Sequence, residues 1–254
     1  MKKILLMLFT TFLINTSLFA NDYTVIRFGA DPNYAPFAYK DNTGTLVGFE
    51  IDIGNAICAH LNVRCQWVES DFDGMIPSLN AGKIDAILAS MTITAARQKV
   101  IDFSSEVFSS PTAMVLRPGT ELSRGMAVGY LQGSTQEVYA RQVLVSQGLK
   151  VVAYADQEQV YADLLTGRLQ ASLQDAQQAQ SGFLRSPQGA GFMLGPMIES
   201  PLMPSKSGIG IGIAKGNHAL KNLLDKGLAA LHADGTYARL QAQYFAGVNM
   251  FSGQ

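Results

Sequence analysis

The sequence has few features that would hold a protein in a membrane or on nucleic acid. After the first twenty residues there is no run of about 18 apolar residues, so no later segment is long enough to span a bilayer. Blocks of like charge and low-complexity tracts are also absent. The 254 residues include 19 basic and 20 acidic ones. This balance argues against nucleic acid or an acidic membrane surface as partner, because both favour a basic face.

Groups for metal, nucleotide or nucleophilic chemistry are scarce as well. There are three histidines and two cysteines. His60 lies near Cys58 and Cys65, but no second pair of ligands follows at a spacing usual for zinc. We find no Ser-His-Asp set, and the glycine-rich stretch 207–217 lacks the GxGxxG spacing and is typical of a strand followed by a turn. The sequence therefore predicts no metal and no cofactor.

The N-terminus has the pattern of an export signal. Lys2 and Lys3 precede an apolar stretch, 4–13, and small residues close the segment at 17–20. A buried N-terminal helix is the alternative, but the charged start and the small-residue end favour a secretory signal over residues 1–20. The exported chain then begins near Asn21, with 17 basic residues against 20 acidic ones and a net charge of −3.

Strand and helix patterns alternate along the rest of the chain, which is 48% apolar and long enough for one large domain or two small ones. This alternation favours an α/β fold with mainly parallel sheets. In the oxidising compartment that export implies, the two cysteines most simply form a disulfide between a helix and the next strand. The expected strands are 25–29, 65–68, 84–89, 126–131, 150–154 and 169–173, and the expected helices are 50–61, 73–81, 94–100, 135–147, 157–166 and 175–184.

One internal similarity suggests two lobes. LNAGKIDAILAS (79–90) is similar to LLTGRLQASLQD (164–175): each ends a helix, turns on a glycine and enters a strand. Counting eight residues from each glycine gives Ser90 and Asp175, which both fall at the carboxyl end of a strand, where open α/β sheets bind ligands. Chance similarity within a common helix–turn–strand pattern is the alternative. Two lobes that each present strand ends would leave a cleft between them.

Polar side chains stand at these strand ends. Asp31 follows the first strand, and it is either a binding acid or an ordinary turn-starting residue before Pro32. Thr94 can cap a helix and so place Arg97 in its first turn. A cation there opposes the helix dipole, which makes sense if Arg97 binds an anion. The alternative is a solvated surface arginine.

The stretch LQGSTQE (131–137) adds a helix start. Ser134 and Glu137 form a capping box, and the free amides of Thr135 and Gln136 can face an anion, although many capping boxes have no other role. Asp175 can accept from an ammonium group or simply cap the helix after it. Arg97, Thr135 and the helix start would suit a carboxylate; Asp175, Ser90 and Thr92 would suit an ammonium; Tyr34 and Phe72 would form flat apolar walls. The set matches a free amino acid.

These stretches resemble the periplasmic amino-acid-binding proteins of ABC importers, and most closely their lysine/arginine/ornithine- and histidine-binding branch. The resemblance covers essentially the whole exported chain and rests on the number, order and spacing of its motifs. They are DPNYAPF (31–37), GFEIDIGNAIC (48–58), IPSLNAGKIDAIL (76–88), MTITAARQK (91–99), LQGSTQE (131–137), YADLLTGRLQASLQD (161–175) and ADGTYARL (233–240).

The resemblance implies a two-lobe periplasmic-binding-protein fold (type II). Each lobe would be a mixed, mostly parallel sheet flanked by helices, and two hinge strands would join the lobes. Residues 21–110 and 206–254 would form lobe 1, and residues 111–205 would form lobe 2. The resemblance also implies a Cys58–Cys65 disulfide, a periplasmic location, an inner-membrane ABC permease as partner and a monomeric state.

The resemblance further implies one role for each site residue. Arg97 and Thr135 would bind the α-carboxylate of the ligand, and Asp175 and Thr92 its α-amino group. Asp31 would meet a distal cation on the ligand side chain. Tyr34 and Phe72 would sandwich the aliphatic stem of that side chain, and the pocket would be completed by Ser90, Met91, Leu131 and Gln136.

The sequence departs from this branch in places, and other functions stay open. Ala89 stands where close relatives often carry serine, Phe72 replaces a smaller apolar residue found in some relatives, and QDAQQ (174–178) lacks the acid that often follows the aspartate. These changes bear on which ligand fits best. We expect arginine first, then lysine, ornithine and histidine, with a neutral amino acid or an opine as alternatives. An enzyme on the same fold, such as a cyclohexadienyl dehydratase, is a further alternative, which a prephenate or arogenate turnover assay would test.

Overall fold

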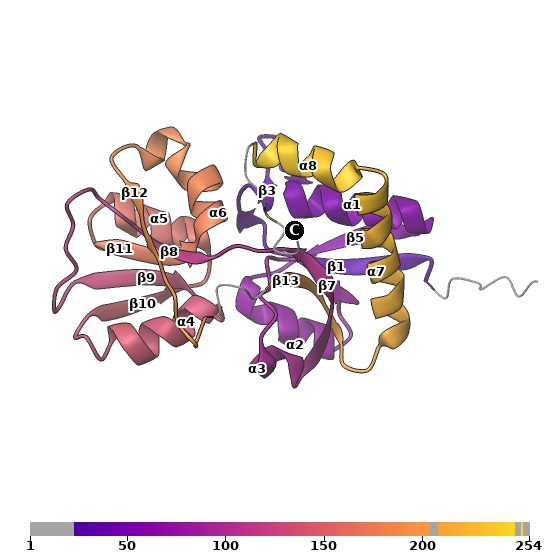
Figure 1. The fold of residues 1–254 in the computed structure, drawn as a ribbon, viewed down its shortest axis with the longest axis horizontal. Helices are drawn as coiled ribbons and strands as arrows, with labels where there is room; N and C mark the ends of the chain where they lie inside the picture. The colour runs from indigo at the N-terminus through magenta and orange to yellow at the C-terminus, as the bar shows by residue number, and fades with distance from the viewer. Residues whose placement is uncertain (1–22, 204–207, 247–249, 251–254) are drawn as a thin grey trace, which may run out of the picture.

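Two separate five-stranded sheets organise the chain (Figure 1). The computed structural model describes residues 23–203, 208–246 and 250. We call the half built on the first sheet lobe 1 and the half built on the second sheet lobe 2. The strand order is β5 (Arg64–Glu69), β1 (Val25–Ala30), β6 (Ala86–Ile87), β13 (Ile209–Ala214), β7 (Ile101–Phe108) in lobe 1, and β10 (Lys150–Tyr154), β9 (Ala127–Leu131), β11 (Ala171–Asp175), β8 (Thr112–Leu116), β12 (Met193–Met197) in lobe 2.

Both sheets are mixed, as predicted. In lobe 1, β1 pairs in parallel with β5 and β6, whereas β13 runs antiparallel to β6 and β7. In lobe 2, β9 pairs in parallel with β10 and β11, whereas β8 runs antiparallel to β11 and β12. One strand in each sheet, β13 in lobe 1 and β8 in lobe 2, runs against the other four, so each sheet has two parallel and two antiparallel pairs.

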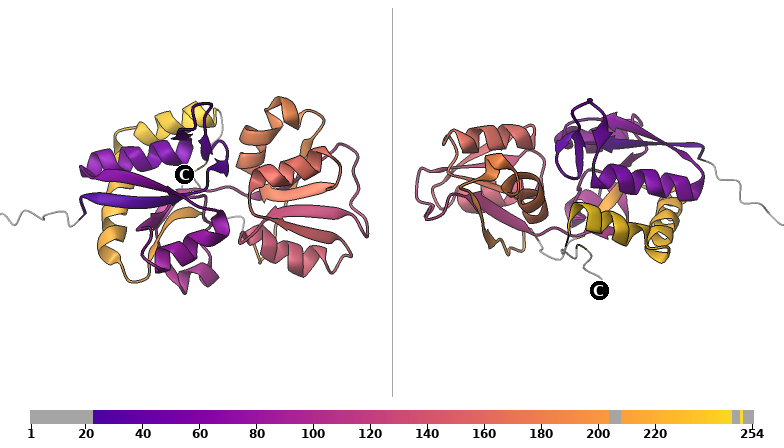
Figure 2. Two further views of the ribbon diagram at one scale, coloured as in Figure 1. Left: turned by 180° about the vertical axis from the view of Figure 1, so that it is seen from behind. Right: turned by 90° about the horizontal axis from the view of Figure 1, so that it is seen from above.

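Helices cover both sheets (Figures 1 and 2). None in the described ranges has the length and apolarity that crossing a membrane requires. Lobe 1 also carries a small sheet of β2 (Asn33–Tyr34), β3 (Ala38–Lys40) and β4 (Leu46–Val47). The helices of lobe 1 are α1 (Phe49–Leu61), η1 (Phe72–Gly74), α2 (Met75–Asn80), α3 (Ala95–Gln98), α7 (His218–Ala233) and α8 (Thr236–Tyr244). Those of lobe 2 are α4 (Thr135–Tyr139), η2 (Ala140–Leu144), α5 (Gln157–Leu165), α6 (Ala176–Gln178), η3 (Ala179–Leu184) and η4 (Pro187–Gly189).

An aromatic cluster in lobe 1 fixes the loop that follows β1. Phe37 is fully buried and packs 5.0 Å, centroid to centroid, from both Phe108 and Phe245. Phe49, at the start of α1, meets Phe245 edge-on at 5.2 Å. Burying such rings stabilises a fold by a few kcal/mol each and leaves them few alternative positions. The loop that carries Asp31 is therefore held against a rigid core.

The cysteines form the expected disulfide. Cys58 in α1 is bonded to Cys65 in β5, with 5.8 Å between their Cα atoms. His60 instead pairs with Asp234 at 2.9 Å, and no group of three metal-ligating side chains occurs in the described residues.

The chain crosses between the lobes twice. The first crossing leads from β7 into β8, and the second leads from β12 back to β13 (Figure 1). The lobe boundary predicted at 205/206 and the signal predicted over 1–20 both lie outside the described residues.

Candidate functional site

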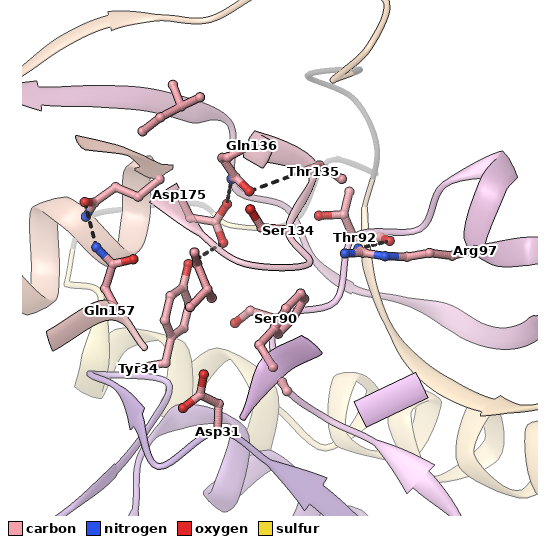
Figure 3. Close-up of a pocket in the computed structure, with 15 residues that line it drawn as sticks. Asp31, Tyr34, Ser90, Thr92, Arg97, Ser134, Thr135, Gln136, Gln157 and Asp175 are labelled. Atoms are coloured by element: carbon pink, nitrogen blue, oxygen red, sulfur yellow. Dashed lines mark hydrogen bonds between the residues drawn. The ribbon is translucent and has the colours of Figure 1, made fainter. Parts of the chain in front are cut away.

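A cavity lies where the two lobes face each other (Figure 3). It contains about 410 Å³ of space between atoms, its opening to solvent included. The residues that line it are Asp31, Tyr34, Phe72, Ala89, Ser90, Thr92 and Arg97 from lobe 1, and Leu131, Ser134, Thr135, Gln136, Gln157, Leu173, Gln174 and Asp175 from lobe 2.

All but one of the eleven binding residues named from the sequence line this cavity. The exception is Met91, whose side chain is 1% exposed and belongs to the hydrophobic core of lobe 1. Side chains of successive residues in an extended segment point to opposite sides. Because Thr92 faces the cavity, the side chain of Met91 points toward the core. We therefore leave Met91 out of the site.

Sequence reasoning missed several residues that line the cavity. Ser134 and Gln174 belong to stretches that were noted for their neighbours, and Leu173 precedes Gln174 in β11. Gln157 begins α5, just after β10 ends at the same edge of the sheet. The strand-end rule could have found it, because Gln157 comes three residues after the carboxyl end of β10.

Asp31 has a free carboxylate oxygen inside the protein. The residue is 2% exposed. Its Oδ1 accepts from the backbone N–H of Asn33 at 3.0 Å, which is the local turn bond expected of an aspartate before proline. Its Oδ2 is buried without a hydrogen-bond partner in the described part of the chain. Burial raises the pKa of Asp31 to about 6, and the backbone bond from Asn33 opposes that rise.

A second buried acid, Glu50, fixes Ser90. Oε1 of Glu50 accepts from the backbone N–H of Ser90 at 2.7 Å, and Oε2 accepts from its hydroxyl at 3.2 Å. Ser90 has φ of 51°, which costs energy for a residue other than glycine, and these two bonds compensate. Burial raises the pKa of Glu50 to about 8. Glu50, which does not itself line the cavity, thus orients Ser90 in the cavity wall.

Asp175 ends β11 inside the cavity and does not cap the helix that follows. Its Oδ1 accepts from Nε2 of Gln136 at 2.8 Å and its Oδ2 accepts from the hydroxyl of Tyr34 at 2.8 Å. Burial raises the pKa of Asp175 to about 6, although these bonds and the charge of Arg97 act in the other direction. The carboxylate is therefore held in one orientation by both lobes.

Arg97 is held in place by backbone oxygens. Thr94 caps α3 by accepting from the N–H of Arg97 at 3.2 Å, as predicted. The guanidinium donates to the carbonyl of Thr92 at 2.8 Å and to that of Gly133, in lobe 2, at 3.0 Å, and lies 5.4 Å from the centre of the Phe72 ring. Burial lowers its pKa to about 10, so it stays charged. With five N–H donors, it keeps others for an anion in the cavity.

The helix start after β9 also forms as predicted, with one difference. The Ser134 hydroxyl accepts from the N–H of Glu137 at 3.3 Å. In a capping box the carboxylate of Glu137 would accept from the backbone N–H of Ser134. Here its Oε2 accepts from the N–H of Gly133 instead, at 2.7 Å. The glycine at this turn has φ of 76° and makes the close approach to lobe 1 possible, because a Cβ there would lie 2.9 Å from the Cβ of Asp73.

The site therefore combines one half-buried guanidinium, that of Arg97, with two buried carboxyl groups that line the cavity, Asp31 and Asp175. Buried charges cost several kcal/mol unless they are paired. The excess of acid over base at one cavity favours an occupant that brings positive charge, and the guanidinium favours one that also carries a carboxylate.

Comparison with known proteins assigns the chain to a family. A model of the bacterial extracellular solute-binding proteins, family 3, matches residues 26–247. The chain belongs to this family. The membership agrees with the resemblance seen in the sequence, and the two-lobe fold predicted from that resemblance is confirmed.

Individual proteins are similar to this chain over most of its length. A lysine/arginine/ornithine-binding periplasmic protein of Escherichia coli (strain K12) is 42% identical over 255 residues, which cover 96% of this chain and 97% of that protein. A histidine-binding periplasmic protein of the same strain is 38% identical over 254 residues, with the same coverage. The solved structure of an ancestral arginine-binding protein bound to arginine has a TM-score of 0.80 at 33% identity, and covers 87% of this chain and 98% of that one.

Proposed function

We propose that this protein is a periplasmic receptor that closes around one cationic L-amino acid, with arginine preferred over lysine, ornithine and histidine. It would deliver this ligand to an ABC permease of the inner membrane and would catalyse no reaction. The signal over 1–20 would export it. The names of its relatives in family 3 support this proposal.

The free Oδ2 of Asp31 is the observation that carries the proposal. A buried carboxylate oxygen without a donor is costly, and a guanidinium or ammonium group would satisfy it. Arginine is preferred because its planar guanidinium suits both an acid and flat rings. Tyr34 and Phe72, which line the same cavity, would hold the stem of the side chain.

The remaining groups match the α-substituents of an amino acid. Arg97 and Thr135 would bind the α-carboxylate, and Asp175 and Thr92 the α-ammonium. Ser90, Leu131 and Gln136 would complete the walls. The lobes would span residues 21–110 with 206–254, and residues 111–205, and they would close on each other when contacts form on both sides of the ligand. We expect a monomer.

Thermal unfolding against a ligand panel tests the proposal. Arginine, lysine, ornithine, histidine and neutral citrulline, which has the size of arginine, are added to protein refolded free of ligand. A ligand at about 100 times its Kd should add about 2.7 kcal/mol to the free energy of unfolding. For a chain of this size, the expected rise in Tm is roughly 5–10 °C.

Variants of Asp31 test whether its carboxylate recognises the cation on the ligand side chain. Asp31→Asn should lower arginine affinity by roughly 30-fold or more, because it unpairs a buried charge. The variant should bind arginine and citrulline with similar affinities. Glu121→Gln makes the same chemical change at an exposed position and should change nothing. If citrulline and arginine bind wild-type protein equally, Asp31 does not determine specificity and the proposal fails.

A further inference from the structure

A buried network of amides in lobe 2 ends in a contact with lobe 1. Nε2 of Gln178 donates to the backbone carbonyl of Ala35 at 3.0 Å. Ala35 belongs to the loop of lobe 1 that also carries Asp31 and Tyr34, whereas Gln178 ends α6, just after Asp175. Gln178 is 1% exposed and does not line the cavity.

The network fixes which end of the Gln178 amide faces Ala35. Its Oε1 accepts from the hydroxyl of Tyr161 at 2.6 Å and from Nε2 of Gln174 at 2.8 Å. Because both donors occupy the oxygen, the NH₂ end must point at the Ala35 carbonyl. Gln174 is held in turn by Gln157, whose Nε2 donates to its Oε1 at 2.9 Å. Gln157 and Gln174 line the cavity, so one connected set of amides borders the ligand site and also holds the lobe contact.

A glycine in lobe 2 also lies against the Ala35 carbonyl. A Cβ on Gly182, in η3, would lie 2.2 Å from the carbonyl oxygen of Ala35 and 3.3 Å from Nε2 of Gln178. The first distance is far below any real contact, so only glycine lets the two lobes come this close. When the lobes separate, this clash no longer exists, because the obstructing atom belongs to the other lobe.

We propose that Gln178 and Gly182 form a latch in lobe 2 that holds the carbonyl of Ala35 and so keeps the lobes closed over the ligand. This inference rests on the proposed function, because it assumes that the lobes close around a bound ligand. Gln178 is a positioning residue: it holds the loop with Asp31 and Tyr34 over the cavity without touching what is bound there. It should therefore set how long a ligand stays, and not which ligand is chosen.

Three variants test the latch. Gln178→Glu keeps the size of the side chain but places a carboxylate against the Ala35 carbonyl, so arginine should dissociate more than 10-fold faster. Gln178→Met removes the donor to Ala35 together with the oxygen that accepts from Tyr161 and Gln174, and it should speed dissociation about 3- to 10-fold. Gln147→Glu, an exposed position in lobe 2 with the same chemical change, should dissociate arginine as wild type does. The arginine-to-lysine affinity ratio should stay constant in all of them.

Gly182→Ala separates a latch from a merely structural role. Alanine favours a helix over glycine, so the ligand-free variant should unfold at the same or a higher temperature than wild type. Its arginine affinity should nevertheless fall by more than 10-fold, because the added methyl blocks closure. Small-angle scattering with saturating arginine should give it a larger radius of gyration than wild type.

The outcomes distinguish this inference from the proposed function. Dissociation rates of Gln178→Glu and Gly182→Ala that equal the wild-type rate would overturn the latch while leaving the function in place. If wild-type protein binds a neutral amino acid and no cationic one, the proposed function fails, and the same variants judge the latch with that ligand. If it binds no amino acid, both proposals are wrong.

Discussion

The hydroxyl of Tyr34 in lobe 1 donates a 2.8 Å hydrogen bond to Oδ2 of Asp175 in lobe 2. Burial, followed by the neighbouring charge of Asp175, raises the pKa of Tyr34 well above its ordinary value, so the phenol stays a neutral donor. The residue that was expected to be only a flat wall of the pocket also joins the lobes. Closure and the orientation of the proposed ammonium-binding acid therefore depend on the same bond.

Tyr34→Phe tests this double role. The ring stays in place, but Oδ2 of Asp175 loses its donor, and a hydrogen bond to a charged group contributes about 1.5–3 kcal/mol. We expect arginine affinity to fall by roughly 10- to 100-fold in calorimetric titration, with lysine and ornithine affected to the same degree. Tyr34→Leu removes the flat ring as well and should cost more. An unchanged affinity in Tyr34→Phe would mean that the bond adds nothing to the closed state.

The raised pKa of Asp31 predicts a pH-dependent preference. Asp31 attracts a cation only when ionised, and its pKa of about 6 in the ligand-free protein leaves roughly a tenth of it ionised at pH 5. The affinity ratio of arginine to citrulline should therefore fall by about tenfold between pH 7.5 and pH 5. Asp175 has a similar pKa, but it affects both ligands through their shared α-ammonium.

Calorimetric titration of both ligands at the two pH values measures this ratio. In Asp31→Asn it should be small and independent of pH, which serves as the control. A wild-type ratio that stays constant down to pH 5 would show that Asp31 does not meet the ligand cation.

Glu50 predicts a pH dependence of stability in the ligand-free protein. Its pKa in the folded chain, about 8, lies above the value of an exposed glutamate. The stabilisation from this group is thus complete below about pH 4.5 and is lost as pH rises through 8. Glu50→Gln keeps an oxygen for the Ser90 N–H but cannot ionise.

Thermal unfolding from pH 5 to pH 9 checks the Glu50 prediction. Relative to the variant, wild-type protein should lose stability as pH rises, at about 1.4 kcal/mol for each unit by which the pKa is raised. Glu121→Gln serves as a surface control and should track wild type throughout. A difference between wild type and Glu50→Gln that does not change with pH would contradict the raised pKa.

The sequence was informative wherever structure depends on near neighbours. The caps at Thr94 and Ser134 involve atoms three residues apart, and the turn bond of Asp31 involves atoms two residues apart. Strand patterns that lead into an acid gave Asp31 and Asp175, because the ends of parallel strands meet at one edge of a sheet. The family motifs suggested a role for each residue, which these local patterns do not contain.

Only the tertiary structure decided how these groups are paired. Glu50 binds Ser90 across 40 residues, Tyr34 binds Asp175 across 141, and Gln178 holds Ala35 across 143. Each contact depends on the packing of two lobes or of separate elements, and no residue near either partner in the chain signals it. The sequence by itself determined the family, the fold and most of the cavity wall. The closed arrangement, the burial that shifts the pKa values and the exclusion of Met91 follow from packing.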